Sequence, residues 1–149
     1  GIDPETFYGF HSACNTEKKQ QLWYSREMLL VLWEKALQRQ QAKFVCIQDA
    51  NGEPLAAAFV VWDKHKLYQL LNCYVHEDKD NGARELLTFE VIKLARQLGL
   101  AIDFVSHRNY LRHYGAQRKD FYAIKRSKSA IISLHFFSNW IRSFSHKKL

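Results

Sequence analysis

Residues 67–104 read LYQLLNCYVHEDKDNGARELLTFEVIKLARQLGLAIDF, and the spacing of the apolar residues changes within this stretch. Residues 67–75 are rich in Leu and Tyr and predict a strand. After residue 81 the apolar side chains recur at the three- and four-residue spacing of a helix, which Gly99 ends. Residues 100–104 then predict a short buried strand. A strand, a helix and a strand in this order imply a right-handed crossover and a parallel pairing of the two strands.

Two more strands precede this stretch and complete an antiparallel meander. Residues 43–48 and 55–62 flank the turn sequence DANGEP at 49–54, and a second turn at 63–66 leads into the strand at 67–75. The strand at 55–62 is apolar on both faces, so it is expected in the centre of the sheet.

Two helices are predicted before the strands. The first begins at Asp3 and Pro4, where a capping carboxylate is followed by a proline at the first helical position. Ser25 caps the second helix, which runs to about Gln40. The apolar residues of this second helix recur at helical spacing and predict one apolar stripe, formed by Met28, Leu29, Leu32, Trp33, Ala36 and Leu37.

Either Asp80 or Asn81 is predicted to cap the crossover helix. After the strand at 100–104, the pattern predicts a short helix at 109–114 ended by Gly115, a strand at 117–125 and a tail helix at 129–144 capped by Ser129. The fold class is therefore α+β, with a mixed, mostly antiparallel sheet, a crossover helix and flanking helices in a single domain spanning residues 1–149.

The composition indicates one globular domain. Of its 149 residues 47% are apolar and 14% aromatic, which is enough for a core and excludes intrinsic disorder. No run of about 18 apolar residues predicts a membrane span, and the start does not resemble a signal peptide. The chain lacks an initiator Met, so we expect a piece of a longer protein, either processed or cloned with residues 1–4 from a vector. The cysteines Cys14, Cys46 and Cys73 form no C-x-x-C pair, which favours reduced thiols and a cytoplasmic location.

The net charge of +7, from 22 Lys and Arg against 15 Asp and Glu, has two interpretations. It suits a polyanionic partner such as a nucleic acid or a phosphorylated cofactor, and it also suits a fragment whose other half is missing. The aromatic side chains of the tail helix, such as Phe137 and Trp140, predict packing and an oligomer contact. A homodimer is therefore expected.

Several phrases follow one another in a fixed order along the chain. They are Tyr24-Ser25-Arg26-Glu27, Ala57-Ala58-Phe59-Val60-Val61-Trp62-Asp63-Lys64, Leu67-Tyr68-Gln69-Leu70, Asn81-Gly82-Ala83, Ala95-Arg96-Gln97-Leu98-Gly99-Leu100, Asp103-Phe104 and Tyr114-Gly115-Ala116. In this order they resemble the FemAB-like, acetyltransferase-like domain of the GNAT superfamily, over residues 6–125. The resemblance implies a GNAT-like sheet and the second domain of a two-domain pattern. The chain departs from the family after Phe104, where the family's Asp-Phe-x-Gly-Ser has a glycine and this chain has Ser106.

The resemblance also implies the transfer of an acyl group from a thioester such as acetyl-CoA to a small-molecule or peptide amine. The donor is expected at the end of the strand at 67–75 and the start of the crossover helix, on Tyr74, Val75, Asn81, Gly82, Ala83 and Arg84. The expected catalytic residues are His76 or Glu77 as the base, Asp103 as a base or an anchor for the amine, and Tyr114 as the acid for the leaving thiolate. No metal site is expected, because no two histidines have ligand spacing.

Each assignment has a structural alternative. Gly82 is also typical of a plain helix cap, His76 and Glu77 of a solvated loop, Asp103 of a cap for the following turn, and Cys73 of a buried strand cysteine rather than a nucleophile. Two other functions remain open on the sequence. One is a Fem-type transferase that uses aminoacyl-tRNA, and the other is a degenerate, non-catalytic binding or assembly module.

Overall fold

A four-stranded sheet organises the first part of the chain. The computed structural model describes residues 2–75, 82–105 and 109–117, and the chain divides into two compact units, Gly1–Arg108 and Asn109–Leu149. The sheet has the order β1-β2-β3-β4, and its strands are β1 (Ala42–Gln48), β2 (Pro54–Trp62), β3 (Lys66–Tyr74) and β4 (Ala101–Asp103). Strands β1 to β3 are antiparallel and β4 is parallel to β3, which confirms the predicted fold class.

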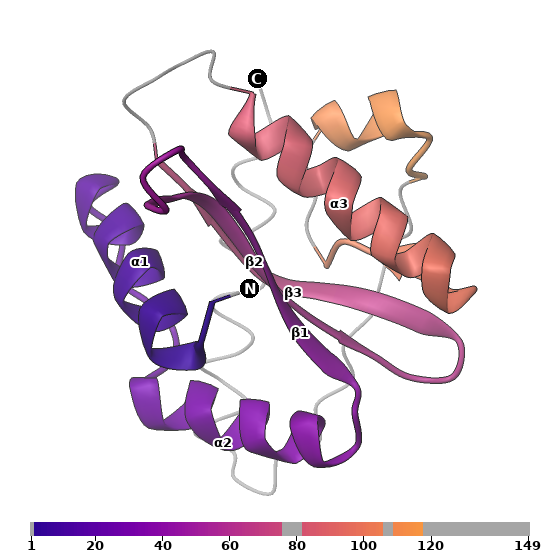
Figure 1. Cartoon of the computed structure of the whole chain (residues 1–149), viewed down its shortest axis with the longest axis horizontal. Coiled ribbons are helices and arrows are strands. Elements are labelled where there is room, and N and C mark those ends of the chain that lie inside the picture. Colours follow the sequence, from indigo (N-terminus) through magenta and orange to yellow (C-terminus); the bar gives the residue numbers. More distant parts are fainter. Residues whose placement is uncertain (1, 76–81, 106–108, 118–149) are drawn as a thin grey trace, which may run out of the picture. The chain divides into compact units, whose positions relative to one another are not determined.

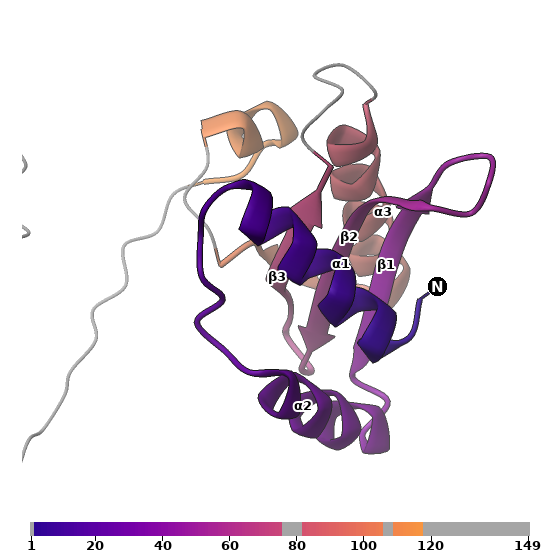
Figure 2. The ribbon, with the colours of Figure 1, turned by 90° about the vertical axis from the view of Figure 1, so that its left-hand side faces the viewer.

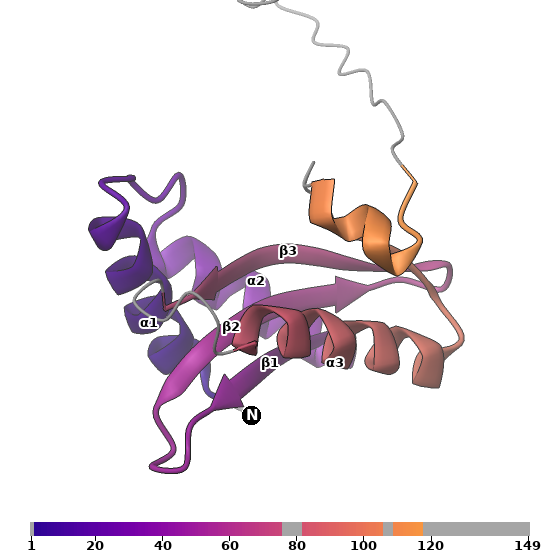
Figure 3. The same cartoon turned by 90° about the horizontal axis from the view of Figure 1, so that it is seen from above.

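Helices cover both faces of this sheet. The helices α1 (Pro4–Glu17) and α2 (Arg26–Gln38) lie on one face, and the crossover helix α3 (Ala83–Leu98) lies on the other (Figures 1 and 3). Figure 2 shows α1 running across the strands on its side of the sheet. Each face therefore has its own apolar core, and β2 contributes to both.

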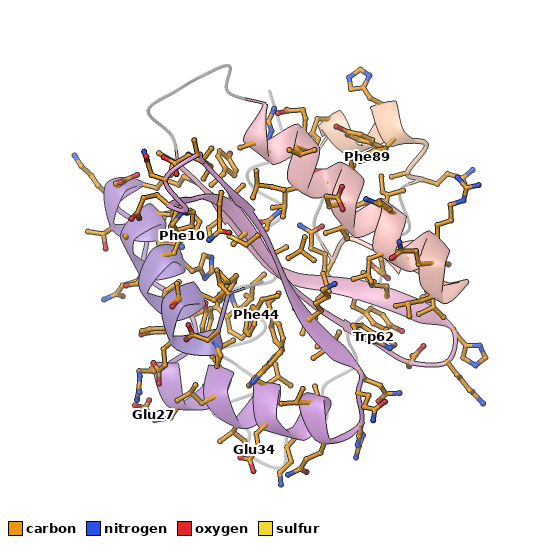
Figure 4. All side chains as sticks on the ribbon, in the orientation of Figure 1. Phe10, Glu27, Glu34, Phe44, Trp62 and Phe89 are labelled. Atoms are coloured by element: carbon orange, nitrogen blue, oxygen red, sulfur yellow. The ribbon has the colours of Figure 1, made fainter. Side chains whose placement is uncertain are left out.

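The central position of β2 follows from its sequence. Residues 56–60 are fully buried, because odd and even side chains of a strand point to opposite faces and both faces are covered here. Ala57 and Phe59 pack with the helices α1 and α2, whereas Ala56, Ala58 and Val60 pack with α3. The aromatic part of the first core includes Phe44, which Figure 4 shows between the sheet and the helices.

Side-chain caps begin two of the helices as predicted. The Asp3 carboxylate accepts from the backbone N–H of Glu5 at 2.9 Å and of Thr6 at 3.0 Å, and the Ser25 hydroxyl accepts from Met28 N–H at 3.3 Å. The crossover helix begins differently, since Gly82 occupies its N-cap in a left-handed conformation with no side-chain cap. Asp80 and Asn81, which the sequence predicts as caps of α3, lie outside the described ranges.

The predicted apolar stripe of α2 is only partly buried. Leu29 is buried and Trp33 packs against Phe44 with ring centroids 4.6 Å apart, but Met28 is 56% exposed, and Leu32 and Leu37 are also exposed. The reason is that α2 packs on α1 and, within the sheet, on the edge strand β1, so only part of its apolar stripe is covered. Glu27 and Glu34 point away from the sheet (Figure 4).

The second unit begins with a short 3-10 helix, η1 (Asn109–Tyr114). Gly115 follows it with a φ of 78°, and its N–H donates to Arg112 O at 2.9 Å, so the predicted short helix and its glycine stop are confirmed. Residues 118–149 lie outside the described ranges, and with them the tail helix at 129–144 and all but the first residue of the strand at 117–125. Within the described residues, no helix is long and apolar enough to cross a membrane.

Candidate functional site

The parallel pair of strands separates soon after it forms. Strand β4 pairs with β3 from Lys66↔Ala101 to Tyr68↔Asp103, and both strands run in the same direction. Strand β3 then continues to Tyr74, whereas β4 ends at Asp103. Among the described residues, no strand pairs with Gln69–Tyr74 on the side away from β2. We call this side of β3 the open edge.

A β-bulge lies where the strands separate. Phe59 pairs with Leu71 but Val60 pairs with Gln69, so Leu70 is an extra residue in β3. A bulge bends its strand and changes the face to which the following side chains point. Leu70 and Leu71 both pack toward the core of α1 and α2 as a result, while Gln69 shares the other face with its partner Val60. The bulge therefore bends β3 at the start of the open edge.

Backbone polar groups point from β3 into the open edge. The Val75 N–H donates to Leu55 O at 2.9 Å, which makes Leu55 and Val75 a hydrogen-bonded pair between β2 and β3. In an antiparallel ladder such pairs alternate with pairs whose N–H and C=O groups point outward. Above the bulge, the outward-pointing residues of β3 are therefore Asn72 and Tyr74. The sequence predicts both Tyr74 and Val75 as donor-binding positions at the end of this strand. The backbone of Tyr74 points into the open edge, whereas the Val75 N–H points to β2.

The open edge leads to the N-terminus of α3. Gly82 has a φ of 66°, and a Cβ added there would meet no atom within 4 Å, so a ligand can approach this backbone closely. The first-turn N–H groups of a helix carry partial positive charge and favour an anion. Ala83 is buried under this turn, and the Arg84 guanidinium donates from Nε to Glu85 at 2.9 Å.

Two cations meet the Tyr74 ring at this end of β3. Lys18 Nζ lies 4.2 Å from the ring centroid, and the Arg84 guanidinium carbon lies 5.7 Å from it. Lys18 comes from the C-terminal end of α1 and Arg84 from the first turn of α3, so the charges come from elements on opposite faces of the sheet. Sequence reasoning missed Lys18, because nothing in the sequence around it distinguishes it from other surface lysines.

Asp103 caps the turn that follows β4. Its Oδ1 accepts from Val105 N–H at 3.0 Å, and its Oδ2 lies 3.9 Å from Lys66 Nζ. The cap is one of the three roles expected for this carboxylate, and the roles as base and amine anchor stay predictions. Val105 adopts a positive φ of 48°, a conformation that glycine adopts more readily than valine.

The structure brings together part of the predicted site. Tyr74, Val75, Gly82, Ala83 and Arg84 all lie at the C-terminal end of β3 or the start of α3. Asp103 lies at the point where β4 leaves β3, and Tyr114 belongs to the second compact unit. The remaining predicted residues, His76, Glu77 and Asn81, lie outside the described ranges.

Cysteine and metal chemistry receive no support from the described residues. Cys73 is buried, and the hydrogen bond with Cys14 together with burial raises the pKa of the Cys73 thiol, which opposes a nucleophilic role. Across residues 2–75, 82–105 and 109–117, no cluster of three His, Cys, Asp or Glu side chains has the arrangement of a metal site.

Solved structures with the same fold include several acetyltransferases. A predicted acetyltransferase with acetyl-CoA from Clostridium acetobutylicum has a TM-score of 0.66 and 12% identity, over 84% of this chain and 92% of that chain. The aminoglycoside acetyltransferase AAC(6')-Iy, in complex with a CoA bisubstrate analogue, has a TM-score of 0.60 and 13% identity, over 85% and 92%. Glucosamine-6-phosphate N-acetyltransferase from Arabidopsis thaliana has a TM-score of 0.57 and 10% identity, over 87% and 95%.

At such low identities these similarities show the fold alone. No curated protein matches the sequence significantly. The family model named Acetyltransferase (GNAT) domain matches residues 5–116, which include the whole sheet, the open edge and the start of α3. The chain belongs to the GNAT acetyltransferase domain family.

Proposed function

We propose that this chain transfers an acyl group from a CoA thioester to an amine. The observation that carries the proposal is the open edge of β3, which leads from the bulge at Leu70 to the N-terminus of α3. An extended ligand with amide groups along its length can pair with such an edge as a further strand would. The acyl-CoA donor has this form, with amides in its pantetheine arm and phosphates at one end.

The two ends of the edge suit the two ends of the donor. The phosphates would lie at the first turn of α3, where Gly82 permits close approach and Lys18 and Arg84 supply positive charge. The thioester would lie toward the bulge, where an outward-pointing backbone N–H such as that of Asn72 can donate to the carbonyl oxygen as negative charge develops on it.

In the proposed reaction a neutral amine attacks the thioester carbonyl, the new C–N bond forms and the C–S bond breaks. One proton leaves the attacking nitrogen, and the departing sulfur takes one up as a thiol. His76 or Glu77 is proposed as the base and Tyr114 as the acid, while Asp103 is proposed to anchor the ammonium group of the acceptor. Amine acceptors fit the similar structures, since one holds an acetylneamine analogue and another is named for glucosamine 6-phosphate.

Binding of acetyl-CoA, measured by isothermal titration calorimetry, tests the proposal. Gly82→Asp places a carboxylate at the expected phosphate position and should weaken binding at least about tenfold. Gly82→Asn is the matched control, because asparagine has the same size and tolerates a positive φ without adding charge. Equal affinity of the aspartate and asparagine variants would contradict phosphate binding at this turn.

The same titration with aminoacyl-tRNA tests the Fem-type alternative, which the net charge of +7 favours. Binding of aminoacyl-tRNA without binding of acetyl-CoA would replace the proposed donor. A wild-type chain that binds neither would indicate a non-catalytic module and would contradict the proposed function.

A further inference from the structure

A buried glutamine on β3 has a side-chain carbonyl without a partner. Gln69 is 5% exposed, and its Oε1 forms no hydrogen bond in the part of the chain that the structure describes. Buried polar side chains in proteins are nearly always paired, because an unpaired one has lost its hydrogen bonds to water and gained none in return. The Gln69 carbonyl is therefore an acceptor that an N–H or O–H group of a bound ligand can satisfy.

Gln69 stands where the open edge begins. The residue before it, Tyr68, is the last residue of β3 that pairs with β4, and the residue after it, Leu70, is the extra residue of the bulge. On the N-terminal side of Gln69, the position beside β3 is filled by β4. A ligand that extends along the open edge from the start of α3 therefore ends beside Gln69.

The side chain of Gln69 lies on the face of the sheet that α3 covers. It shares this face with its partner Val60 on β2 and with Leu67, both of which are fully buried in the core under α3. Asp103, the proposed anchor for the acceptor amine, pairs with Tyr68 and so lies on the opposite face. The apolar neighbours of Gln69 disfavour a charged ammonium group and suit a neutral donor such as a hydroxyl.

We propose that Gln69 selects the acyl group of the donor, and that the preferred group is a 2-hydroxyacyl group, with a hydroxyl on the carbon next to the thioester carbonyl. With the carbonyl oxygen on the Asn72 N–H, the rest of the acyl group extends past the bulge toward the closed end of the edge. There its hydroxyl donates to Gln69 Oε1, whereas an acetyl group leaves this acceptor unpaired. The inference rests on the proposed function, which places the thioester toward the bulge, and deepens it by naming the class of acyl group.

Two CoA esters of matched size test the preference. Hydroxyacetyl-CoA and propionyl-CoA differ only in a hydroxyl that replaces a methyl group, so they share the phosphates, the pantetheine arm and the thioester. Isothermal titration calorimetry of the 149-residue chain measures both. We expect the Kd of hydroxyacetyl-CoA to be at least about tenfold lower than that of propionyl-CoA.

Gln69→Met assigns the preference to the side chain. Methionine has a similar length and volume but no polar group, so the two esters should bind this variant within about threefold of each other. Its melting temperature should equal or exceed that of wild type, because the substitution removes a buried acceptor without breaking a hydrogen bond of Oε1. Gln48→Met is the matched control on β1, with β2 between it and the open edge, and should keep the wild-type preference.

The outcomes separate this inference from the proposed function. Equal affinity of wild type for the two esters, or tighter binding of propionyl-CoA, would overturn the inference and leave the proposed function in place. An unchanged preference in Gln69→Met together with a lower melting temperature would assign Gln69 to packing alone and overturn it as well. A wild-type chain that binds neither ester would overturn the proposed function, and the inference with it. The comparison of the two esters on wild type needs no variant, so it decides the matter even if Gln69→Met does not fold.

Discussion

His11 lies on α1, and its titratable imidazole is buried. Burial, together with the nearby charge of Lys18, lowers the pKa of His11 from 6.5 to about 4. The folded state therefore holds the imidazole neutral at pH 7, whereas the unfolded chain takes up a proton below about pH 6.5. The neighbouring Tyr24 stays protonated in this range, since burial raises the pKa of its hydroxyl.

The stability of the protein should therefore fall as the pH falls from 6.5 to 4. In this window the unfolded state binds a proton that the folded state does not, so the free energy of unfolding decreases by about 2–3 kcal/mol. Urea unfolding of wild type and His11→Gln at pH 7 and pH 4 measures the effect. The wild type should lose more stability than the variant over this range, and parallel losses would contradict a buried neutral His11.

Val105 adopts a backbone conformation that its side chain disfavours. Its φ is 48°, its side chain is 57% exposed, and the Asp103 carboxylate holds its N–H in this turn. Val105→Gly should raise the free energy of unfolding by about 0.5–1 kcal/mol, because relief of the strain exceeds the entropy that a glycine adds to the unfolded state. Val105→Ala keeps a Cβ, so it should raise the melting temperature little. Equal melting temperatures of the glycine variant and wild type would disprove the strain.

At the scale of elements, each helix begins according to the side chain available at its N-cap. Asp3 and Ser25 accept hydrogen bonds from the first turns of α1 and α2, whereas Gly82 offers α3 no side-chain cap. The first turn of a helix carries partial positive charge on its backbone N–H groups, which suits the phosphate end of the proposed donor site.

The contribution of the Ser25 cap to the stability of the protein can be measured by removing the hydroxyl. Ser25→Ala should lower the free energy of unfolding by about 1 kcal/mol, since Met28 N–H then loses its acceptor. Ser12→Ala, the same change in the middle of α1, is the control and should alter stability by less than about 0.5 kcal/mol. Chemical denaturation of the three proteins measures both effects, and similar losses in the two variants would argue against the cap.

At the scale of the molecule, the first unit exposes large apolar side chains. Trp23 is 78% exposed, and Met28, Val31 and Leu32 on α2 are also exposed, while Phe89 on the opposite helix α3 is 55% exposed. Apolar surfaces of this kind mark contacts with other molecules, and twofold dimers are the commonest assembly. The surface of Trp23, Met28, Val31 and Leu32 is therefore a candidate for the homodimer expected from the sequence.

Self-association of the chain is the corresponding prediction. We expect a dimer in sedimentation at micromolar concentration, and Leu32→Lys should shift it toward the monomer by placing a charge on the α2 surface. Phe89→Lys makes the same change on the other face and should leave the dimer intact. A monomeric wild type would rule out the dimer, and a stronger effect of the Phe89 variant would move the contact to α3.

The sequence by itself determined the features that depend on neighbours along the chain. The caps at Asp3 and Ser25, the glycine stops at Gly99 and Gly115 and the change from strand to helix spacing all act within a few residues, so their patterns are visible in the sequence. The resemblance to GNAT domains also came from the order of short phrases, and the match over residues 5–116 confirms it at the level of that family.

Tertiary structure decided the features that depend on residues distant in sequence. The bulge at Leu70 arises from the pairing of two strands, and the open edge exists because β4 is shorter than its partner β3. Lys18 meets Tyr74 only after α1 packs on the sheet, and His11 meets Tyr24 only when α1 and the segment before α2 come together. The buried side of α2 is likewise decided by its neighbours in the fold. The apolar pattern limits which side chains of α2 can be buried, and the contacts with α1 and β1 decide which of them are buried.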